Sequence, residues 1–170
     1  MSRALPLHTA YLALGGNLGD RLAQLRAAAR ELGCAPGIER LDASPVYETT
    51  AVAPGPQPDY LNAVVRVSTT LAPRPLLELG LAIEARLGRL RPVGADKAPR
   101  TIDLDLLLHG SAVIDEPALR LPHPGLLDRP FVRIPLAAVA LPGLRHPVTG
   151  EALDQAADDP GVRRFATDWL

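Results

Sequence analysis

The chain has 170 residues, of which 47% are hydrophobic, and its 18 basic side chains nearly balance 19 acidic ones. This length suits one domain, so we expect residues 1–170 to form a single domain with a sizeable core. A net charge of -1 creates no basic field for nucleic acid or for an anionic membrane. The single cysteine excludes an internal disulfide framework. Without a long apolar run or an export signal, we expect a cytoplasmic protein that binds neither nucleic acid nor membrane.

Hydrophobic periodicity predicts the elements in chain order. Apolar runs bounded by turn residues favour strands at 9–14, 38–48, 61–70, 100–108 and 112–115. Apolar positions at helical spacing favour helices at 20–33, 73–88 and 131–140, with Asp20 as the first N-cap and a proline opening the second helix. Residues 50–58 and 89–99 contain prolines and glycines and are expected to be loops. Residues 151–170 are expected to be a polar, weakly helical tail.

The first six elements follow the order β-α-β-β-α-β. This order is typical of a ferredoxin-like core, so the expected fold class is α/β (α+β). The short strand at 112–115 and the helix at 131–140 would add further strands and helices at the C-terminal side.

The most informative run surrounds Asp103 and Asp105, two carboxylates that stand two residues apart among leucines. Side chains alternate along a strand, so the aspartates share one face and Leu104, Leu106 and Leu108 share the other. Like charges this close raise each other's pKa unless a cation lies between them. Two hard oxygen ligands suit Mg²⁺ held jointly with phosphate oxygens. The alternative is a pair of solvated aspartates on the open face of a half-buried strand.

A glycine-rich segment, Gly15-Gly16-Asn17-Leu18-Gly19, follows the first strand and predicts a tight turn. Such a turn can bring backbone amides close to a phosphate. The segment matches neither G-x-G-x-x-G nor a Walker A motif, so an ordinary turn is the alternative.

Tyr60 and Asn62 stand two apart at the start of a strand and therefore share a face. The ring can stack on a planar ligand and the amide can pair with its polar edge; a half-buried tyrosine beside a turn asparagine is the alternative. His123 lies between two prolines that restrict its backbone. It can donate a hydrogen bond to a phosphate, or it is an ordinary surface histidine.

Arginines precede the two aspartates along the chain. Arg89, Arg91 and Arg100 carry planar, permanently charged groups that suit phosphate oxygens. Phosphoryl transfer needs metal on one side of a polyphosphate and cationic donors on the other, so arginines beside a carboxylate pair point to this chemistry. Glu84, in the second predicted helix, is expected on a solvated face from its helical position alone.

Four motifs occur together in the chain: GGNLGDR at 15–21, PDYLNAV at 58–64, PRTIDLDLL at 99–107 and LPHP at 121–124. In this order and spacing the combination resembles the 6-hydroxymethyl-7,8-dihydropterin pyrophosphokinase family of folate biosynthesis, over about residues 9–150. The resemblance implies transfer of pyrophosphate from ATP to the hydroxymethyl group of the pterin, giving AMP and the pterin diphosphate. It also implies a monomer whose partners are these small molecules.

The resemblance further implies roles for individual residues. Asp103 and Asp105 would hold two Mg²⁺ ions and would form the catalytic group together with Arg89 and Arg100. The pterin would contact Thr49, Val52, Tyr60, Asn62 and Phe131. ATP would contact Glu84, Arg89, Arg91, Arg100, Leu106, His123 and Arg129.

The loop before the aspartates departs from the family pattern. Asp96-Lys97-Ala98-Pro99 stands in place of the Arg-Trp pair that precedes G-P-R-T in many members, where this loop closes over the substrates. Lys97 is a candidate substitute. Two alternatives are open: an Mg²⁺-dependent nucleotidyl or phosphoryl transferase with another acceptor, and a non-catalytic ferredoxin-like module that senses a nucleotide or pterin. The carboxylate pair beside Arg100 favours an enzyme, because sensing does not need two metal ligands.

Overall fold

The computed structural model describes residues 5–52, 55–90 and 98–170. Most of the predicted elements are present, and helices begin and end close to the expected residues. The elements are β1 (His8–Gly16), α1 (Arg21–Gly33), β2 (Ile38–Ala43), β3 (Val46–Thr49), β4 (Tyr60–Thr69), α2 (Pro73–Arg86), β5 (Asp103–His109), β6 (Ile114–Glu116), β7 (Leu119–Leu121), α3 (Pro130–Val139) and β8 (Val162–Ala166).

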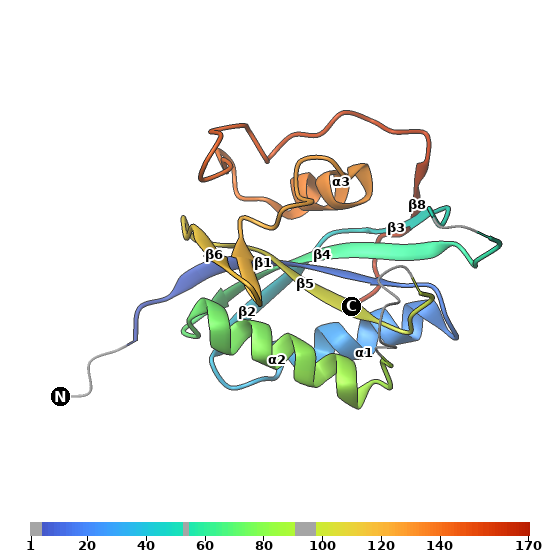
Figure 1. The fold of residues 1–170 in the computed structure, drawn as a ribbon, viewed down its shortest axis with the longest axis horizontal. Coiled ribbons are helices and arrows are strands. Elements are labelled where there is room, and N and C mark those ends of the chain that lie inside the picture. The colour runs from blue at the N-terminus through green and yellow to red at the C-terminus, as the bar shows by residue number, and fades with distance from the viewer. Residues whose placement is uncertain (1–4, 53–54, 91–97) are drawn as a thin grey trace.

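One antiparallel sheet carries the fold, in the order β5-β1-β4-β3-β8, with β2 also paired to β4. β1 is an interior strand, because it pairs with β4 on one side and with the edge strand β5 on the other. With β2 and β3 taken as one interrupted strand, the core follows β-α-β-β-α-β, so the ferredoxin-like prediction is confirmed. Figure 1 shows α1 and α2 on one face of the sheet and α3, with the segment that leads from it to β8, on the other. After β8 the chain returns to the first face, where Trp169 packs in the cluster under α1 and α2.

Local signals in the sequence explain where the helices start. The side chain of Asp20 accepts a hydrogen bond of 3.0 Å from the backbone N–H of Ala23 and so caps α1. Pro73 and Pro130 open α2 and α3, at positions where a backbone N–H would have no helical partner.

Each face of the sheet has its own hydrophobic cluster. The first lies under α1 and α2 and includes Leu25, Leu32 and Ile83. The second lies under α3 and includes Tyr11 and Val132. Because both faces are covered, polar side chains that remain on the sheet need partners or a cavity.

The strand expected at 38–48 is two strands, β2 and β3. Pro45 has no N–H to donate to the ladder. Beside it, the Ser44 hydroxyl, and not a main-chain carbonyl, accepts a 2.9 Å hydrogen bond from the backbone N–H of Val64. The break therefore occurs at a proline that the run of apolar residues around it had concealed.

The expectation of a weakly helical tail at 151–170 is wrong. Residues 162–166 form β8, which pairs with β3 and extends the sheet. Trp169 is 3% exposed, and its indole N–H donates a 2.8 Å hydrogen bond to the carbonyl of Ser44. Pairing and burial of one large side chain override the weak local preference of this polar segment.

Two predictions around β5 also need correction. Tyr11 pairs with Leu108 but Leu12 pairs with Leu106, so Leu107 is an extra residue in the strand. This irregularity moves Leu108 to the second cluster, away from the face of Leu106 on which alternation placed it. The short strand expected at 112–115 begins at residue 114 and is one arm of the β6–β7 hairpin.

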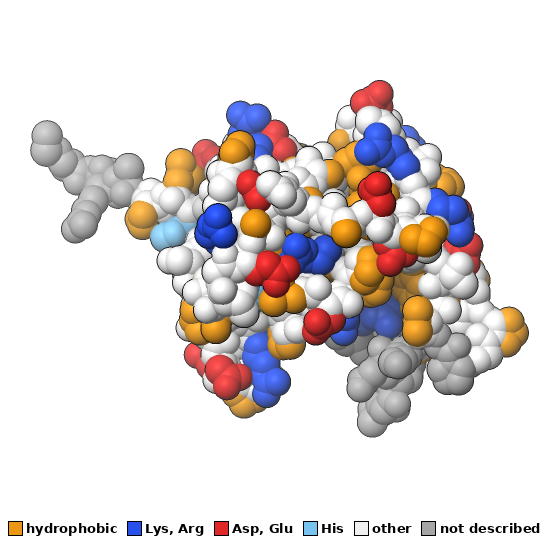
Figure 2. Space-filling model, turned by 90° about the horizontal axis from the view of Figure 1, so that it is seen from above, with side chains coloured by type: hydrophobic (Ala, Val, Ile, Leu, Met, Phe, Trp, Pro, Cys, Tyr) orange, Lys and Arg blue, Asp and Glu red, His pale blue; other side chains and the backbone are white. Residues whose placement is uncertain are grey.

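The face seen in Figure 2 carries acidic and basic side chains interspersed with apolar ones. No single basic area stands out there, in keeping with the nearly equal numbers of charged residues in the sequence. Within the described residues, no helix combines the length and the apolar character that crossing a membrane requires.

Candidate active site

A cavity of about 390 Å³ lies on the α3 face of the sheet, where β1, β4 and β5 approach the first turn of α3. This volume is typical of a small-molecule site. Ten residues singled out in the sequence line it, from several separate segments of the chain. They are Thr49, Val52, Tyr60, Asn62, Arg100, Asp103, Asp105, His123, Arg129 and Phe131.

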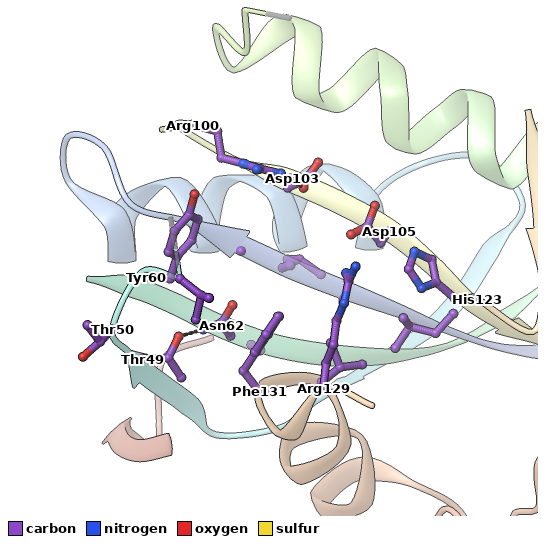
Figure 3. Close-up of a pocket in the computed structure, with 17 residues that line it drawn as sticks. Thr49, Thr50, Tyr60, Asn62, Arg100, Asp103, Asp105, His123, Arg129 and Phe131 are labelled. Atoms are coloured by element: carbon purple, nitrogen blue, oxygen red, sulfur yellow. Dashed lines mark hydrogen bonds and ion pairs between the residues drawn. The ribbon is translucent and has the colours of Figure 1, made fainter. Parts of the chain in front are cut away.

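We call the part formed by Thr49, Tyr60, Asn62 and Phe131 the aromatic end. The Asn62 side-chain amide donates a 2.8 Å hydrogen bond to the Thr49 hydroxyl, and both residues are 8% exposed. Thr49 lies opposite Tyr60 in the ladder of β3 and β4, so the sheet itself holds these groups together. Figure 3 shows the rings of Tyr60 and Phe131 on different sides of the cavity, with room for a flat group between them.

We call the part formed by Arg100, Asp103 and Asp105 the carboxylate end. One oxygen of Asp103 accepts a 2.6 Å hydrogen bond from Arg100, and the other lies 3.2 Å from Nη2 of Arg89. The guanidinium carbon of Arg100 also lies 5.9 Å from the ring centroid of Tyr60. Arg100 therefore lies between the two ends and contacts both.

Asp105 shares the cavity face with Asp103, as the alternation of the strand predicted. Burial, followed by the charges of Asp103 and Glu84, raises the pKa of the Asp105 carboxyl from 3.8 to about 6, against the opposing charges of Arg100 and Arg129. Within the described part of the chain, no lysine or arginine forms an ion pair with Asp105. A cation placed against this carboxylate would favour its charged form.

The chemistry of the two aspartates fits Mg²⁺, which takes one or two carboxylates and completes its octahedron with water and phosphate oxygens. Among the residues that the structure describes, no group of three or more His, Cys, Asp or Glu side chains could hold a metal ion alone. An ion at this end would therefore take its remaining ligands from a phosphate-bearing substrate and from water.

Glu84 does not lie on a solvated helix face. It is 1% exposed, and its carboxylate accepts a 2.7 Å hydrogen bond from the backbone N–H of Leu104. Its other oxygen lies 3.2 Å from Nε of Arg89, which in turn holds Asp103. The prediction of a solvated face, made from helical position alone, is wrong because α2 packs on the start of β5. The sequence pattern does not show this packing. Glu84 thus supports the carboxylate end from behind the sheet.

His123 and Arg129 line the cavity near Asp105 (Figure 3). Nδ1 of His123 accepts a 3.0 Å hydrogen bond from the backbone N–H of Gly125, so the proton of the neutral ring is on Nε2. Burial and the charge of Arg129 lower the pKa of His123, which keeps the ring neutral at pH 7. The ring therefore offers one N–H donor.

Some residues predicted to contact ATP lie elsewhere. Glu84 and Arg89 support Asp103 without lining the cavity, and Leu106 points into the first hydrophobic cluster on the opposite face. Arg91 and Lys97 lie outside the described residues, as does most of the loop that the resemblance expects to close over the substrates.

Gly15 and Gly16 belong to β1 and not to the predicted turn. Both glycines pair with β4 in the regular antiparallel register, and Gly15 also pairs with β5. In the segment from residue 15 to residue 19, positive φ occurs only at Gly19, where it is +67°. The turn is therefore shorter than the glycine content suggests.

Two amides of the turn already have main-chain partners and are not available to a phosphate. The backbone N–H groups of Asn17 and Leu18 donate to the carbonyl of Arg100 at 2.9 and 3.2 Å. The Asn17 side chain accepts from the Arg100 N–H at 2.9 Å and donates to the carbonyl of Pro58 at 3.1 Å. Asn17 thus joins the segments that carry Arg100 and Tyr60, a role that its sequence context did not indicate.

Sequence reasoning also missed lining residues that have little chemical character of their own. β1 contributes small residues to the floor, and their spacing of two is the only signal that could have suggested a shared face. The missed residues are Ala13, Leu14, Thr50, Ala63, Leu107 and Val132. Gly15, which the sequence singled out only as part of the expected turn, also lines the cavity.

Comparison with known proteins identifies the family. The family model of 7,8-dihydro-6-hydroxymethylpterin-pyrophosphokinase matches residues 11–141, a stretch that contains every residue lining the cavity. The chain belongs to this family. The expectation of a pyrophosphokinase enzyme is therefore confirmed.

Two curated pyrophosphokinases are similar to this chain over most of their own length, and a third relative is a much longer protein. The 2-amino-4-hydroxy-6-hydroxymethyldihydropteridine pyrophosphokinase of Synechocystis sp. is 42% identical over 149 residues, which cover 87% of this chain and 74% of that protein. The enzyme of the same description from Methylorubrum extorquens is 40% identical over 158 residues, which cover 91% of this chain and 97% of that protein. The folic acid synthesis protein fol1 of Schizosaccharomyces pombe is 38% identical over 161 residues, but this chain spans 22% of its length.

Solved structures show the same fold in the pyrophosphokinase family at much lower identity. The structure of HPPK-DHPS in complex with substrates superposes with a TM-score of 0.67 at 14% identity, covering 88% of this chain and 42% of that one. The structure of wild-type Plasmodium falciparum HPPK-DHPS with pterin and p-hydroxybenzoate superposes with a TM-score of 0.63 at 15% identity. The superposition covers 91% of this chain and 42% of that one. This chain thus spans less than half the length of those chains, and the likeness concerns the fold.

Proposed function

We propose that this chain transfers a pyrophosphoryl group from ATP to the hydroxymethyl oxygen of 6-hydroxymethyl-7,8-dihydropterin, giving AMP and the pterin diphosphate for tetrahydrofolate synthesis. The observation that carries the proposal is the single cavity that joins an aromatic end to a carboxylate end. A flat acceptor and a metal-bound polyphosphate need these two environments side by side.

The aromatic end would bind the pterin. Tyr60 and Phe131 flank the ring, because their side chains face the cavity from β4 and from the first turn of α3. Asn62 and Thr49 bond its polar edge, and their mutual hydrogen bond holds them in place before the ligand arrives. Val52, which is 84% exposed at the rim, supplies backbone contacts.

The carboxylate end would bind the triphosphate. Asp103 and Asp105 would hold two Mg²⁺ ions, with phosphate oxygens as further ligands. When bound, Mg²⁺ neutralises negative charge on the attacked phosphate and on the departing AMP. Arg89, which is itself held by Glu84, keeps the Asp103 carboxylate oriented while the triphosphate is bound.

Cationic and neutral donors would contact the phosphates from the other side. Arg100 and Arg129 present guanidinium groups, and His123 donates from Nε2. These contacts orient the β-phosphorus for in-line attack by the hydroxymethyl oxygen. Positioning and electrostatic stabilisation supply most of the rate enhancement in such transfers. Leu106 supports this end from the opposite face of the sheet rather than by contact.

We further propose that residues 1–170 act as one domain, as a monomer in the cytoplasm. Both hydrophobic clusters pack on the same sheet, which supports the single domain.

The reaction is tested by incubating the protein with ATP, Mg²⁺ and 6-hydroxymethyl-7,8-dihydropterin and separating the nucleotides by anion exchange. We expect AMP in an amount equal to the pterin consumed. ADP as the product would contradict the proposal and indicate simple kinase chemistry. Binding of both ligands without turnover would support the sensing module, and binding of ATP alone would indicate another acceptor.

A further inference from the structure

The floor of the cavity between its two ends is formed by β1. This strand turns Tyr11, Ala13 and Gly15 toward the α3 face, and Leu12 and Leu14 toward the first cluster. The side chains on the α3 face therefore become smaller along the strand. At Gly15 the floor is bare main chain.

Gly15 occupies a defined place between the two ends. In the ladder it lies opposite Asn62 of β4 on one side and opposite Asp103 of β5 on the other. Neighbouring strands are about 4.8 Å apart, so the main chains that carry the amide and the carboxylate are roughly 10 Å apart. Figure 3 shows Asn62 and Asp103 on either side of this central strand. An acceptor held at Asn62 must cross above Gly15 to reach the carboxylate end.

A side chain at this position would interfere with Asn62. A Cβ added to Gly15 would lie 3.2 Å from Oδ1 of Asn62 and 3.6 Å from the carbonyl of Leu61. To make room, the amide must shift by a few tenths of an ångström, and this shift strains the hydrogen bond that its nitrogen donates to Thr49. The backbone of Gly15 does not require glycine, since its φ is not in the positive region.

We propose that Gly15 is a positioning residue for the acceptor: its missing side chain leaves the Asn62 amide in the orientation that holds the flat ring and its arm over β1. The inference rests on the proposed function, because it assumes that a pterin occupies the aromatic end. It predicts a defect confined to the acceptor, since the carboxylate end has no contact with the added Cβ.

The adjacent Gly16 provides a matched control, because it faces the other side of the sheet. A Cβ on Gly16 would lie 2.3 Å from the carbonyl oxygen of Thr101 and 3.4 Å from that of Arg100. Main-chain atoms cannot yield as a side chain does. Gly16→Ala is therefore expected to displace the segment that carries Arg100, lowering both the melting temperature and the affinity for ATP.

The test compares Gly15→Ala, Gly16→Ala and wild type by calorimetry and thermal unfolding. Titrations use the pterin and a non-hydrolysable ATP analogue with Mg²⁺. For Gly15→Ala we expect acceptor affinity to fall about 10-fold, within the range for one added methyl group in a fitted site. Affinity for the ATP analogue and the melting temperature should stay at wild-type values. Equal losses for both ligands, or no loss for either, would overturn the proposal.

A double-mutant cycle shows whether the effect runs through Asn62. In an Asn62→Ala background, adding Gly15→Ala should weaken the remaining acceptor affinity far less than it does in wild type. An undiminished loss in that background would overturn the assigned route. Failure of the proposed function is a separate result, because it would appear as absent pterin binding or absent AMP formation in the wild-type protein.

Discussion

The aromatic end of the cavity is held by neutral hydrogen bonds within the sheet, whereas the carboxylate end gathers like charges on two half-buried side chains, Asp103 and Asp105. At the aromatic end, one 2.8 Å hydrogen bond from the Asn62 amide to the Thr49 hydroxyl fixes both side chains before any ligand is present. At the carboxylate end, two arginines pair with Asp103, and Asp105 keeps a raised pKa. One end is preformed and the other is electrostatically unbalanced.

The difference indicates how each end contributes to the reaction. A preformed neutral site binds its ligand with little reorganisation and with little dependence on salt or pH. A site with excess negative charge gains from cations, so its affinity depends on metal and on pH. Changes at the two ends should therefore have separable consequences.

The largest effect is expected from removing either carboxylate. Asp103→Ala or Asp105→Ala should lower kcat by about three orders of magnitude or more, because stabilisation of phosphoryl charge by metal contributes several kcal/mol. Steady-state kinetics at saturating substrates and circular dichroism would measure rate and fold. Asp115→Ala is the control, since that side chain is 86% exposed and lies in the β6–β7 hairpin. Near-normal turnover in both active-site variants would refute the metal role.

The raised pKa of Asp105 predicts a pH-dependent stability of the ligand-free protein. The folded value of about 6 exceeds the ordinary 3.8, so the contribution of this group is full below about pH 4 and is lost as pH rises through 6. The free energy of unfolding therefore falls by roughly 3 kcal/mol as Asp105 becomes charged in the folded protein. Asp105→Asn should remove it and make the ligand-free protein more stable than wild type at neutral pH. Denaturant unfolding between about pH 4 and pH 8 would show this, and parallel profiles for the two proteins would contradict it.

Loss of an aromatic ring should weaken the acceptor selectively. Tyr60→Ala or Phe131→Ala is expected to reduce pterin affinity about 10-fold, since a stacked ring contributes about 1 kcal/mol beyond its buried area. ATP affinity should change much less. Phe165→Ala, at a ring that is 46% exposed on β8, is the matched control. Equal losses of both ligands in calorimetry would refute the stacking role.

The smallest effect is expected from the hydrogen bond between Thr49 and Asn62. Thr49→Val removes the acceptor for the amide while keeping the shape, and should cost about 1 kcal/mol of pterin binding. Thr49→Ser should restore most of it. If Thr49→Val binds pterin as tightly as wild type, the preformed character of the aromatic end is wrong.

Elements with local signals could be predicted from the sequence. Asp20, Pro73 and Pro130 mark helix starts by chemistry that acts within one turn. The strand β8 could not be predicted, because its pairing with β3 and the burial of Trp169 depend on residues more than a hundred positions away. The extra residue Leu107 likewise appears only when β5 is aligned with β1.

The candidate site was predictable where side chains carry distinctive chemistry. Asp103, Asp105, Tyr60 and Asn62 have functional groups and spacings that suggest a ligand, and the structure brings them to one cavity. Gly15 has no such group. Its importance depends on the register that places it between two strands, and register is a property of the folded sheet.

The most direct test of the central claim follows the β-phosphorus of ATP. With radioactive phosphorus at that position, Mg²⁺ and 6-hydroxymethyl-7,8-dihydropterin, pyrophosphoryl transfer moves the label into the pterin product and leaves AMP unlabelled. We predict labelled pterin diphosphate, formed by wild type and not by Asp105→Ala. Label that remains in ADP while the pterin gains a single phosphate would contradict the account.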